Sequence, residues 1–397
     1  MRFRRLLILI FFICALIPVS EVWAQNIPVA SIPFHPNNGH IIIKVKLEGK
    51  EPINFLFDSG AGGTLISRKM AESLGLFPIV SRKNVGVSGA HEVGAIKGVD
   101  LGIGEVIIKD ITLLSTETKF EELDNGEIIH GVVGYPILSR YVVEVDFIKH
   151  ELKLFDRTSY FYYGEGVSIP INIVMNLPVV EAGVMLYNGE SFIGNFIIDT
   201  GARSELIISS PTVVWYDIAN NVGEHYTLRK AIGTSKRRSK VRYGRLASVN
   251  FANKEFCDIP VALSSDNKGV LADPSFDGII GNALLSRYNI VFDYYMNMLH
   301  IAPNQSIDKK FIVNTTGFNI VYKKGKPYLK DLIERSPADF AGLRNGDELI
   351  AIDGKSIAEL GSKAVRTSLQ EPGIKVELVV RRNKEMIKVE FVTESLI

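Results

Sequence analysis

Two short segments of the chain each end a hydrophobic run with an aspartate. The first, residues 55–61, reads FLFDSGA, and the second, residues 196–202, reads FIIDTGA. In each segment the hydrophobic residues predict a buried strand that delivers a carboxylate, and the glycine that follows allows the chain to turn sharply. Asp58 and Asp199 are therefore the first candidates for chemistry.

A single aspartate at a strand end is an ordinary turn residue, but two of them on homologous lobes can meet across a pseudo-twofold axis. Two carboxyl groups about 3 Å apart cannot both ionise easily, so one pKa rises and the other falls. The ionised carboxylate can then take a proton from water while the protonated one donates to a carbonyl oxygen. Asp58 and Asp199 would in this way hydrolyse an amide bond without a metal or a covalent intermediate.

A second matched pair of motifs lies downstream of the aspartates. Residues 131–134 read GVVG and residues 278–281 read GIIG, and a Leu-Ser-Arg-Tyr sequence follows each of them. The spacing from aspartate to first glycine is 73 residues in one case and 79 in the other. Motifs that recur in the same order at nearly equal spacing indicate an internal duplication. We therefore predict two homologous lobes, residues 25–157 (lobe 1) and 165–303 (lobe 2).

Short strands dominate both predicted lobes. Hydrophobic runs bounded by glycine or charged turns predict strands at 41–47, 54–57, 106–114, 142–147, 151–155, 192–198, 248–251, 259–263 and 290–292. Helical signal is scarce. Ser67 is predicted to cap a short helix that runs to Leu74, and single turns are expected at 136–140 and 283–287. The fold class of the lobes is therefore mainly β.

The paired motifs resemble those of the retropepsin-like aspartic proteases. The alanine that ends each motif, Ala61 or Ala202, is the retroviral form. The resemblance implies a bilobal aspartic protease built from two acid-protease β lobes, with Asp58 and Asp199 as the catalytic pair that activates water. Retroviral enzymes are homodimers of one lobe. Because both lobes share one chain here, the resemblance implies an active monomer.

The resemblance also assigns supporting roles by position. Ser59 and Thr200 would tie the two active-site loops together through their hydroxyl groups, and the GVVG and GIIG segments would brace the loops from below. Asp146 and Asp293 also match between the repeats, and we interpret them as structural because they follow the braces. The floor of the active site would be shaped by Gly60, Ala61, Gly201 and Ala202.

Each lobe of such an enzyme should carry a hairpin flap. A flap would exclude water and hold an extended peptide by main-chain hydrogen bonds. A plain hairpin is the alternative in both places, because glycine turns occur in any β protein. The candidates are Gly86, Val87, Ser88 and Gly89 in lobe 1, and Ile232, Gly233 and Thr234 in lobe 2.

A different pattern follows a predicted linker at residues 304–314. The sequence from Ser336 to Gly354 contains SPADFAGL, NGDELI and IDG, and it resembles a PDZ domain that would span residues 315–397. The resemblance implies an α+β domain, a small β-barrel with two helices, of which one is expected at 357–369. Its glycine loop would present backbone N–H groups to a peptide carboxyl terminus, with the peptide added as a strand. A packing module without a ligand is the alternative. The matching loop residues are Gly317, Phe318, Asn319 and Ile320, with Asn319 where eukaryotic members have glycine.

The composition excludes several classes of protein. Of the 397 residues, 46% are hydrophobic and 22% are charged, which is typical of globular domains and not of disordered or fibrous chains. The 45 basic residues balance 44 acidic ones, so no charge excess indicates nucleic acid, and we interpret the basic run at 236–240 as a solvated loop. Seven histidines and two cysteines show no metal-ligand spacing. We expect neither a metal nor a cofactor.

The first 24 residues predict a secretory signal peptide. Three arginines precede a hydrophobic run at 6–17, and Val22-Trp23-Ala24 forms a small-residue cleavage site before Gln25. The run is shorter than the roughly 20 residues that span a bilayer, so we expect no membrane span after cleavage. We expect an exported protein, periplasmic in a Gram-negative bacterium or secreted.

The sequence therefore predicts an exported aspartic endopeptidase that cleaves extended polypeptides. The PDZ domain would recruit polypeptide substrates or bind the carboxyl terminus of a partner. Two alternatives stay open. One is a non-catalytic peptide-binding or scaffold protein on the same fold, and the other is a hydrolase that processes a single partner protein.

Overall fold

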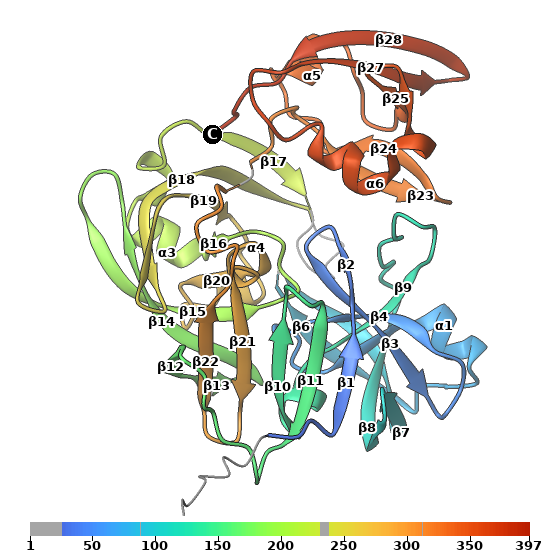
Figure 1. The fold of residues 1–397 in the computed structure, drawn as a ribbon, viewed down its shortest axis with the longest axis vertical. Helices are drawn as coiled ribbons and strands as arrows, with labels where there is room; N and C mark the ends of the chain where they lie inside the picture. The colour runs from blue at the N-terminus through green and yellow to red at the C-terminus, as the bar shows by residue number, and fades with distance from the viewer. Residues whose placement is uncertain (1–25, 88, 231–237, 312) are drawn as a thin grey trace, which may run out of the picture.

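The computed structural model describes residues 26–87, 89–230, 238–311 and 313–397. Two β lobes lie side by side, and a smaller C-terminal domain lies above both of them (Figure 1). The fold is mainly β, as the sequence predicted. Within the described ranges, no helix is long and apolar enough to cross a membrane.

Lobe 1 contains an eight-stranded sheet that closes on itself. The pairing of β3 with β7 joins two strands that lie far apart in the sheet order, and this pairing makes a barrel. Phe55, Phe57 and Leu101 fill its interior and are fully buried. The strand order is β2 (His35–Asn37), β3 (His40–Leu47), β4 (Ile53–Phe57), β9 (Ile129–Val133), β5 (Thr64–Ser67), β8 (Val106–Thr116), β7 (Gly89–Ile103) and β6 (Val80–Gly86).

Lobe 2 repeats this architecture strand for strand. The pairing of β14 with β18 closes its sheet in the same way as β3 with β7. The topology therefore agrees with the duplication inferred from the motifs. The strand order is β13 (Asn172–Val174), β14 (Leu177–Met185), β15 (Ser191–Asp199), β20 (Gly278–Gly281), β16 (Leu206–Ile208), β19 (Lys254–Ser264), β18 (Ser239–Phe251) and β17 (Tyr226–Lys230).

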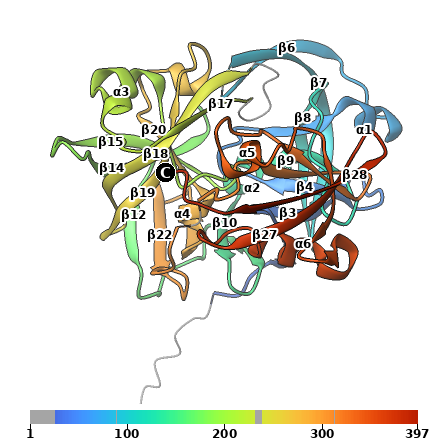
Figure 2. The ribbon, with the colours of Figure 1, turned by 90° about the horizontal axis from the view of Figure 1, so that it is seen from above.

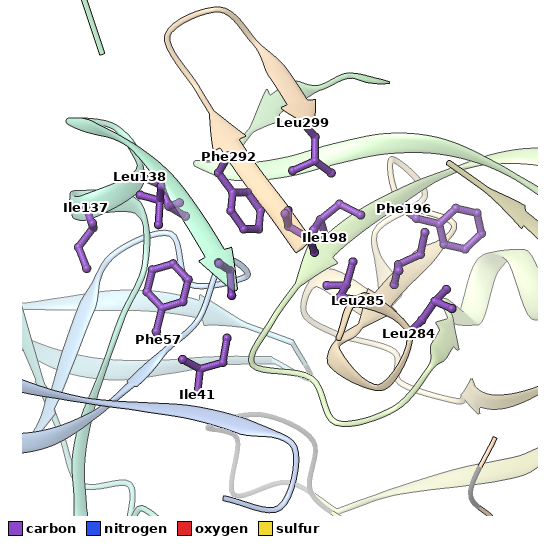
Figure 3. Packing of buried hydrophobic residues seen from close by; sticks show 14 of the residues in the cluster. Ile41, Phe57, Ile137, Leu138, Phe196, Ile198, Leu284, Leu285, Phe292 and Leu299 are labelled. Carbon is purple, nitrogen blue, oxygen red and sulfur yellow. The ribbon is translucent and has the colours of Figure 1, made fainter. Parts of the chain in front are cut away.

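A six-stranded antiparallel sheet joins the two lobes, with three strands from each. The central strands pair through Glu144 and Val291, and one hydrophobic core runs through both lobes. Phe57 from lobe 1 and Ile198 and Phe292 from lobe 2 lie close together in this core (Figure 3). The strand order is β1 (Ala30–Pro33), β11 (Glu151–Asp156), β10 (Tyr141–Asp146), β21 (Tyr288–Asp293), β22 (Met298–Pro303) and β12 (Val167–Pro170).

The two aspartates interpreted as structural lie at the ends of the central strands of this sheet. Asp146 Oδ1 accepts hydrogen bonds from the backbone N–H groups of Ile148 and Lys149. Asp293 Oδ1 accepts one from the N–H of Met296. Both carboxylates thus hold the turns that follow β10 and β21.

The helices of the lobes are short. Helix α1 (Arg68–Ser73) begins at Ser67, whose side chain accepts a hydrogen bond from Met70, as predicted. The expected single turns are α2 (Tyr135–Leu138) and α4 (Asn282–Leu285). Helix α3 (Ser210–Trp215) was not predicted, because its β-branched residues have a higher strand propensity. The remaining turns are the 3-10 helices η1 (Ile218–Asn220) and η2 (Val270–Ala272).

The C-terminal domain has its own hydrophobic core. The predicted helix at 357–369 is α6 (Ile357–Thr367), and it breaks at Gly361, whose φ of 70° and ψ of 160° are not helical. The other helix is α5 (Pro337–Phe340), which is capped by the side chain of Ser336. The sheet contains β23 (Asn319–Lys323), β24 (Lys326–Lys330), β25 (Glu348–Ile352), β27 (Lys375–Arg382) and β28 (Glu385–Val392), with β26 (Lys355–Ser356) paired to β25.

Candidate active site

The two predicted catalytic aspartates lie together at equivalent places in the two lobes. Asp58 directly follows β4, and its N–H donates to the carbonyl of Val133 in the parallel strand β9 (2.9 Å). Asp199 is the last residue of β15 and pairs in register with Gly281 of the parallel strand β20. Because the preceding strands are buried in the lobes, they determine the position of each carboxyl group.

The loops that carry the aspartates are hydrogen-bonded to each other across the lobes. The N–H of Ser59 donates to Thr200 Oγ1, and the N–H of Thr200 donates to Ser59 Oγ, both at 3.0 Å. Each hydroxyl then donates to a strand of the opposite lobe, at Ile198 (2.7 Å) and Phe57 (3.3 Å). All four groups are buried, so losing one hydroxyl would leave unpaired partners in the protein interior. This geometry is the tie that the resemblance implied for Ser59 and Thr200.

Gly60 and Gly201 allow the two carboxyl groups to approach. A Cβ atom on Gly60 would lie 2.4 Å from Cγ of Asp199, and one on Gly201 would lie 2.4 Å from Cγ of Asp58. Any side chain at either position would therefore push the opposite aspartate away. The remaining floor residues are Ala61, whose N–H donates to the carbonyl of Asp58, and Ala202.

The downstream glycine segments pack directly beneath the active-site loops. A Cβ atom on Gly134 would lie 2.0 Å from the carbonyl oxygen of Asp58, and one on Gly281 would lie 2.1 Å from that of Ser204. The first glycines, Gly131 and Gly278, are equally close to the carbonyl oxygens of β5 and β16. Backbone contact of this kind excludes every side chain, which explains why both repeats retain both glycines.

The two carboxyl groups have different surroundings. Asp199 Oδ1 accepts hydrogen bonds from the N–H groups of Gly201 (2.8 Å) and Ala202 (2.9 Å). Asp58 receives one from Gly60 and shares a hydrogen bond with Asp199. Asp58 Oδ1 is buried and makes no hydrogen bond to any described residue.

These surroundings separate the protonation states of the pair. Burial raises the pKa of Asp58 well above its usual range, and the charge of Asp199 and the hydrogen bond to it add to the rise. Burial also raises the pKa of Asp199, but the hydrogen bonds from Asp58, Gly201 and Ala202 oppose that rise. These surroundings favour the shared proton on Asp58 and the negative charge on Asp199. Such a pair can act as acid and base at once.

The predicted flap of lobe 1 is the hairpin of β6 and β7, with Gly86 and Gly89 at the ends of its strands. Its tip reaches lobe 2, where the carbonyl of Val87 accepts a hydrogen bond from Leu271 (3.1 Å). Val87 packs on the same hydrophobic cluster as Ala202 of the active-site loop. The hairpin thus closes from one lobe onto the other, beside the aspartates, and Figure 2 shows β6 and β7 extending toward β17. Ser88 lies outside the described residues.

The equivalent hairpin of lobe 2 is formed by β17 and β18, which pair from Tyr226 with Tyr243 up to Lys230 with Ser239. A hairpin is therefore present where the second flap was predicted. Its tip, with the candidates Ile232, Gly233 and Thr234, lies outside the described residues.

The predicted peptide-binding loop of the PDZ domain is partly bonded to itself. Gly317 has a φ of 95°, and a Cβ atom there would lie 2.0 Å from Ser336 Oγ. Its N–H donates to Asn314 Oδ1 (2.8 Å), and the N–H of Phe318 donates to Thr316 Oγ1 (3.4 Å). Phe318 is buried in the domain core. Asn319 and Ile320 begin the edge strand β23, with Asn319 exposed.

One charged cluster beside the aspartates was not found from the sequence. Arg203, which directly follows the floor residue Ala202, donates from both terminal nitrogens to the carboxylate of Glu121 (3.0 and 3.3 Å). His40 Nε2 lies 3.9 Å from the same carboxylate. Burial and the charge of Arg203 lower the pKa of His40 to about 4, so it is neutral at neutral pH. Arg203 directly follows the matched aspartate motif, where lobe 1 has Gly62, and this difference between the repeats was the signal that the sequence offered.

Comparison with known proteins gives two family matches. Residues 43–137 match the family described as aspartyl protease, and residues 329–382 match the family described as PDZ domain. Among solved structures, the crystal structure of an aspartic proteinase from Irpex lacteus is similar, with 13% sequence identity and a TM-score of 0.40 over 71% of this chain and 99% of that chain. No curated protein matches the sequence. The first family match contains Asp58, and the second contains α5 and α6.

Proposed function

Because the chain carries a retropepsin-like aspartyl protease region and a PDZ domain, we propose that it is an aspartic endopeptidase. It hydrolyses peptide bonds of extended polypeptides with water activated between Asp58 and Asp199. One observation carries the proposal. The glycine of each aspartate loop lies directly against the carboxyl group of the opposite loop, and Ser59 and Thr200 lock the two loops together across the lobes.

The protonation states give each aspartate a role. Asp199 takes a proton from water as the water oxygen adds to the scissile carbonyl carbon, and Asp58 gives its proton to the carbonyl oxygen. A tetrahedral diol results. When the C–N bond breaks, Asp199 passes its proton to the amide nitrogen and Asp58 regains one from a diol hydroxyl. The pair returns to its initial state, and the cycle uses no cofactor.

The proposal also includes the location and the assembly of the protein. Residues 1–24 have the signal-peptide pattern, so we place the enzyme in the periplasm of a Gram-negative bacterium or outside the cell. Both aspartates lie in one chain, so a monomer is sufficient for activity. The PDZ domain recruits polypeptide substrates or binds the carboxyl terminus of a partner.

The decisive experiment compares the mature chain from Gln25 with its Asp58→Asn and Asp199→Asn variants. Each protein is incubated with a proteome-derived peptide library between pH 3 and pH 8, and new termini are identified by mass spectrometry. We expect cleavage by the wild type, and a loss of about a thousandfold in each variant. The same data supply the cleavage preference.

The matched control is Asp308→Asn, which changes an exposed aspartate paired with Lys254 (2.7 Å). It should cleave as the wild type does. If the wild type makes no cuts that depend on Asp58 or Asp199 at any pH, the proposal is wrong. The fold would then serve as a peptide-binding or scaffold protein, or as an enzyme for one partner only.

A further inference from the structure

One acidic segment of lobe 1 contacts both the active-site loop of lobe 2 and the PDZ domain. This segment, residues 121–126, is here named the acidic strap, and it reads EELDNG between β8 and β9. It forms the tip of a turn closed by the bridge between Glu122 and Ile128. In Figure 1 the turn lies directly beneath β23.

The inner contact of the strap is the ion pair between Glu121 and Arg203. Two hydrogen bonds join the carboxylate and the guanidinium, a geometry that fixes the orientation of both groups. Both side chains are about half exposed. The Cγ atom of Arg203 lies 3.6 Å from the position that a Cβ atom on Gly39 would occupy, so Arg203 packs against Gly39. The carbonyl oxygen of Gly39 in turn accepts a hydrogen bond from the side chain of Asn282.

Arg203 is well placed to control the orientation of Asp199. The two N–H groups that hold Asp199 Oδ1 belong to Gly201 and Ala202, and Arg203 is the next residue. A rotation of the backbone at Arg203 therefore moves the donors that hold the Asp199 carboxyl group. Short charge-assisted hydrogen bonds of this kind depend steeply on geometry.

The equivalent loop of lobe 1 is held in a different way. Gly62 replaces Arg203, and its carbonyl accepts a hydrogen bond from the side chain of Asn176 (3.1 Å) in the opposite lobe. A Cβ atom on Gly62 would lie 3.0 Å from the carbonyl oxygen of Met175. Close backbone packing thus fixes the Asp58 loop, whereas a side-chain ion pair to the strap supports the Asp199 loop.

The outer contacts of the strap are with the PDZ domain. The N–H of Gly325, in the turn between β23 and β24, donates to Glu122 Oε1 (2.6 Å). The hydroxyl of Ser362 in α6 donates to Asp124, and Gly126 packs on Gly325. These contacts leave Glu121 pointing to lobe 2 while its neighbours are bound to the PDZ domain.

We propose that Glu121 is a positioning residue for the peptidase reaction and that the PDZ domain holds it in place. The inference rests on the proposed function, and it adds a catalytic task for the PDZ domain besides recruitment. Glu121 acts through Arg203 on the amides of the Asp199 loop. The two tasks differ in kinetics, since support of the active-site loop changes kcat, whereas recruitment changes KM.

The first test is Glu121→Gln, assayed on a peptide taken from the mapped cleavage sites. We expect kcat to fall about fivefold, the effect of a half-exposed ion pair, while KM stays within about twofold. Glu121→Asp, which retains the charge, should recover part of the loss. The control is Glu117→Gln in the same β8–β9 connection, which loses an ion pair with Arg68 (3.0 Å) within lobe 1 and should leave kcat unchanged.

The second test is a double-mutant cycle across the PDZ interface. Glu122→Gln with Ser362→Ala should lower kcat by about twofold in the wild-type background. In the Glu121→Gln background the same changes should have no further effect, because the PDZ contacts act through Glu121. The control is Glu390→Gln, which breaks a pair with Lys375 (2.6 Å) within the PDZ domain.

A readout without turnover separates this inference from the proposed function. Hydrogen exchange at the amides of Gly201 and Ala202 should be faster in Glu121→Gln than in the wild type or Glu117→Gln. That difference is measurable even if the wild type cleaves no peptide, which would refute only the proposed function. Unchanged exchange and unchanged kcat, or a change confined to KM, would refute the positioning role of Glu121.

Discussion

At the scale of single residues, the two aspartates share a motif but have different hydrogen-bond donors. Asp199 Oδ1 accepts from two backbone amides, those of Gly201 and Ala202, whereas Asp58 receives one from Gly60. More donors favour the charged form of a carboxyl group. The pseudo-twofold symmetry is therefore broken in the hydrogen bonds that the two carboxyl groups accept.

The raised pKa of Asp58 predicts a pH-dependent stability difference. The folded protein binds the Asp58 proton more tightly than the unfolded chain, so this contribution to stability is complete below about pH 4 and is lost as the pH rises through the raised pKa. The Asp58→Asn variant has no carboxyl group at this position, so its stability does not fall in this way as the pH rises. The variant should therefore be more stable than the wild type at pH 7, and the difference should become smaller as the pH falls toward 3.5.

Urea denaturation of both proteins at pH 3.5, 5 and 7 measures this difference. Asp308→Asn, which removes an exposed carboxyl group, serves as the control. A stability difference that does not change with pH would show that the carboxyl of Asp58 is not strained by burial and by its neighbour.

At the scale of elements, the hairpin of β6 and β7 is held by backbone contacts with lobe 2. The carbonyl groups of Gly86 and Val87 crowd Gly269, and the N–H of Leu271 donates to Val87. Gly269 has a φ of 84°, and a Cβ atom there would lie 2.3 Å from the nitrogen of Gly89. A glycine is thus required for this docked position of the hairpin.

We predict that Gly269→Ala releases the hairpin from lobe 2 and lowers kcat/KM by roughly tenfold, because a closed flap holds the substrate. Gly189→Ala is a matched control, since Gly189 has a φ of 87° and no atom within 4 Å of an ideal Cβ. Both substitutions strain the backbone by about 1 kcal/mol, but only the first disturbs the hairpin. Peptidase kinetics and hydrogen exchange at Leu271 compare the two. Equal effects would contradict a role of hairpin docking.

At the scale of the whole molecule, the two lobes share a hydrophobic core, whereas the PDZ domain is connected to them by the linker and by polar contacts. A shared core and the pairing of β10 with β21 connect the lobes, whereas the PDZ domain has its own core. The linker is fastened by Arg287, which donates to the carbonyls of Ser306 (3.2 Å), Ile307 (3.3 Å) and Lys309 and lies 4.0 Å over the ring of Phe311. Among the described residues, the polar contacts between the PDZ domain and the lobes include those of Gly325 and Ser362 with the acidic strap.

We predict that Arg287→Lys loosens the linker, because an ammonium group cannot reach several carbonyls and stack on a ring as a guanidinium does. Limited chymotrypsin digestion should cut near Phe311 about fivefold faster, releasing an intact PDZ domain and intact lobes. Arg157→Lys is the control, since Arg157 also bonds a carbonyl, that of Ser139, and stacks on Tyr295. Equal cleavage rates in both variants would refute the fastening role of Arg287.

The sequence alone determined the features that are local or repeated. The aspartate motifs, the glycine braces, the two lobes and most strands follow from short patterns, because a buried strand needs continuous hydrophobic residues and a crowded backbone needs glycine. The duplication made these signals stronger, since each motif appears twice at a similar spacing. The break of α6 at Gly361 was missed because a single residue outweighs the regional pattern, and helix α3 was missed because its β-branched residues favour a strand.

Only the tertiary structure decided which polar residues meet. Glu121 and Arg203 are 82 residues apart, and Glu122 and Gly325 are 203 apart. A single ion pair or hydrogen bond between residues this far apart produces no periodic pattern and no motif in the sequence. Its energy depends on where two elements finally lie, and their positions are determined by hydrophobic packing elsewhere. The support of the Asp199 loop by the strap, and of the strap by the PDZ domain, is for this reason a property of the folded molecule.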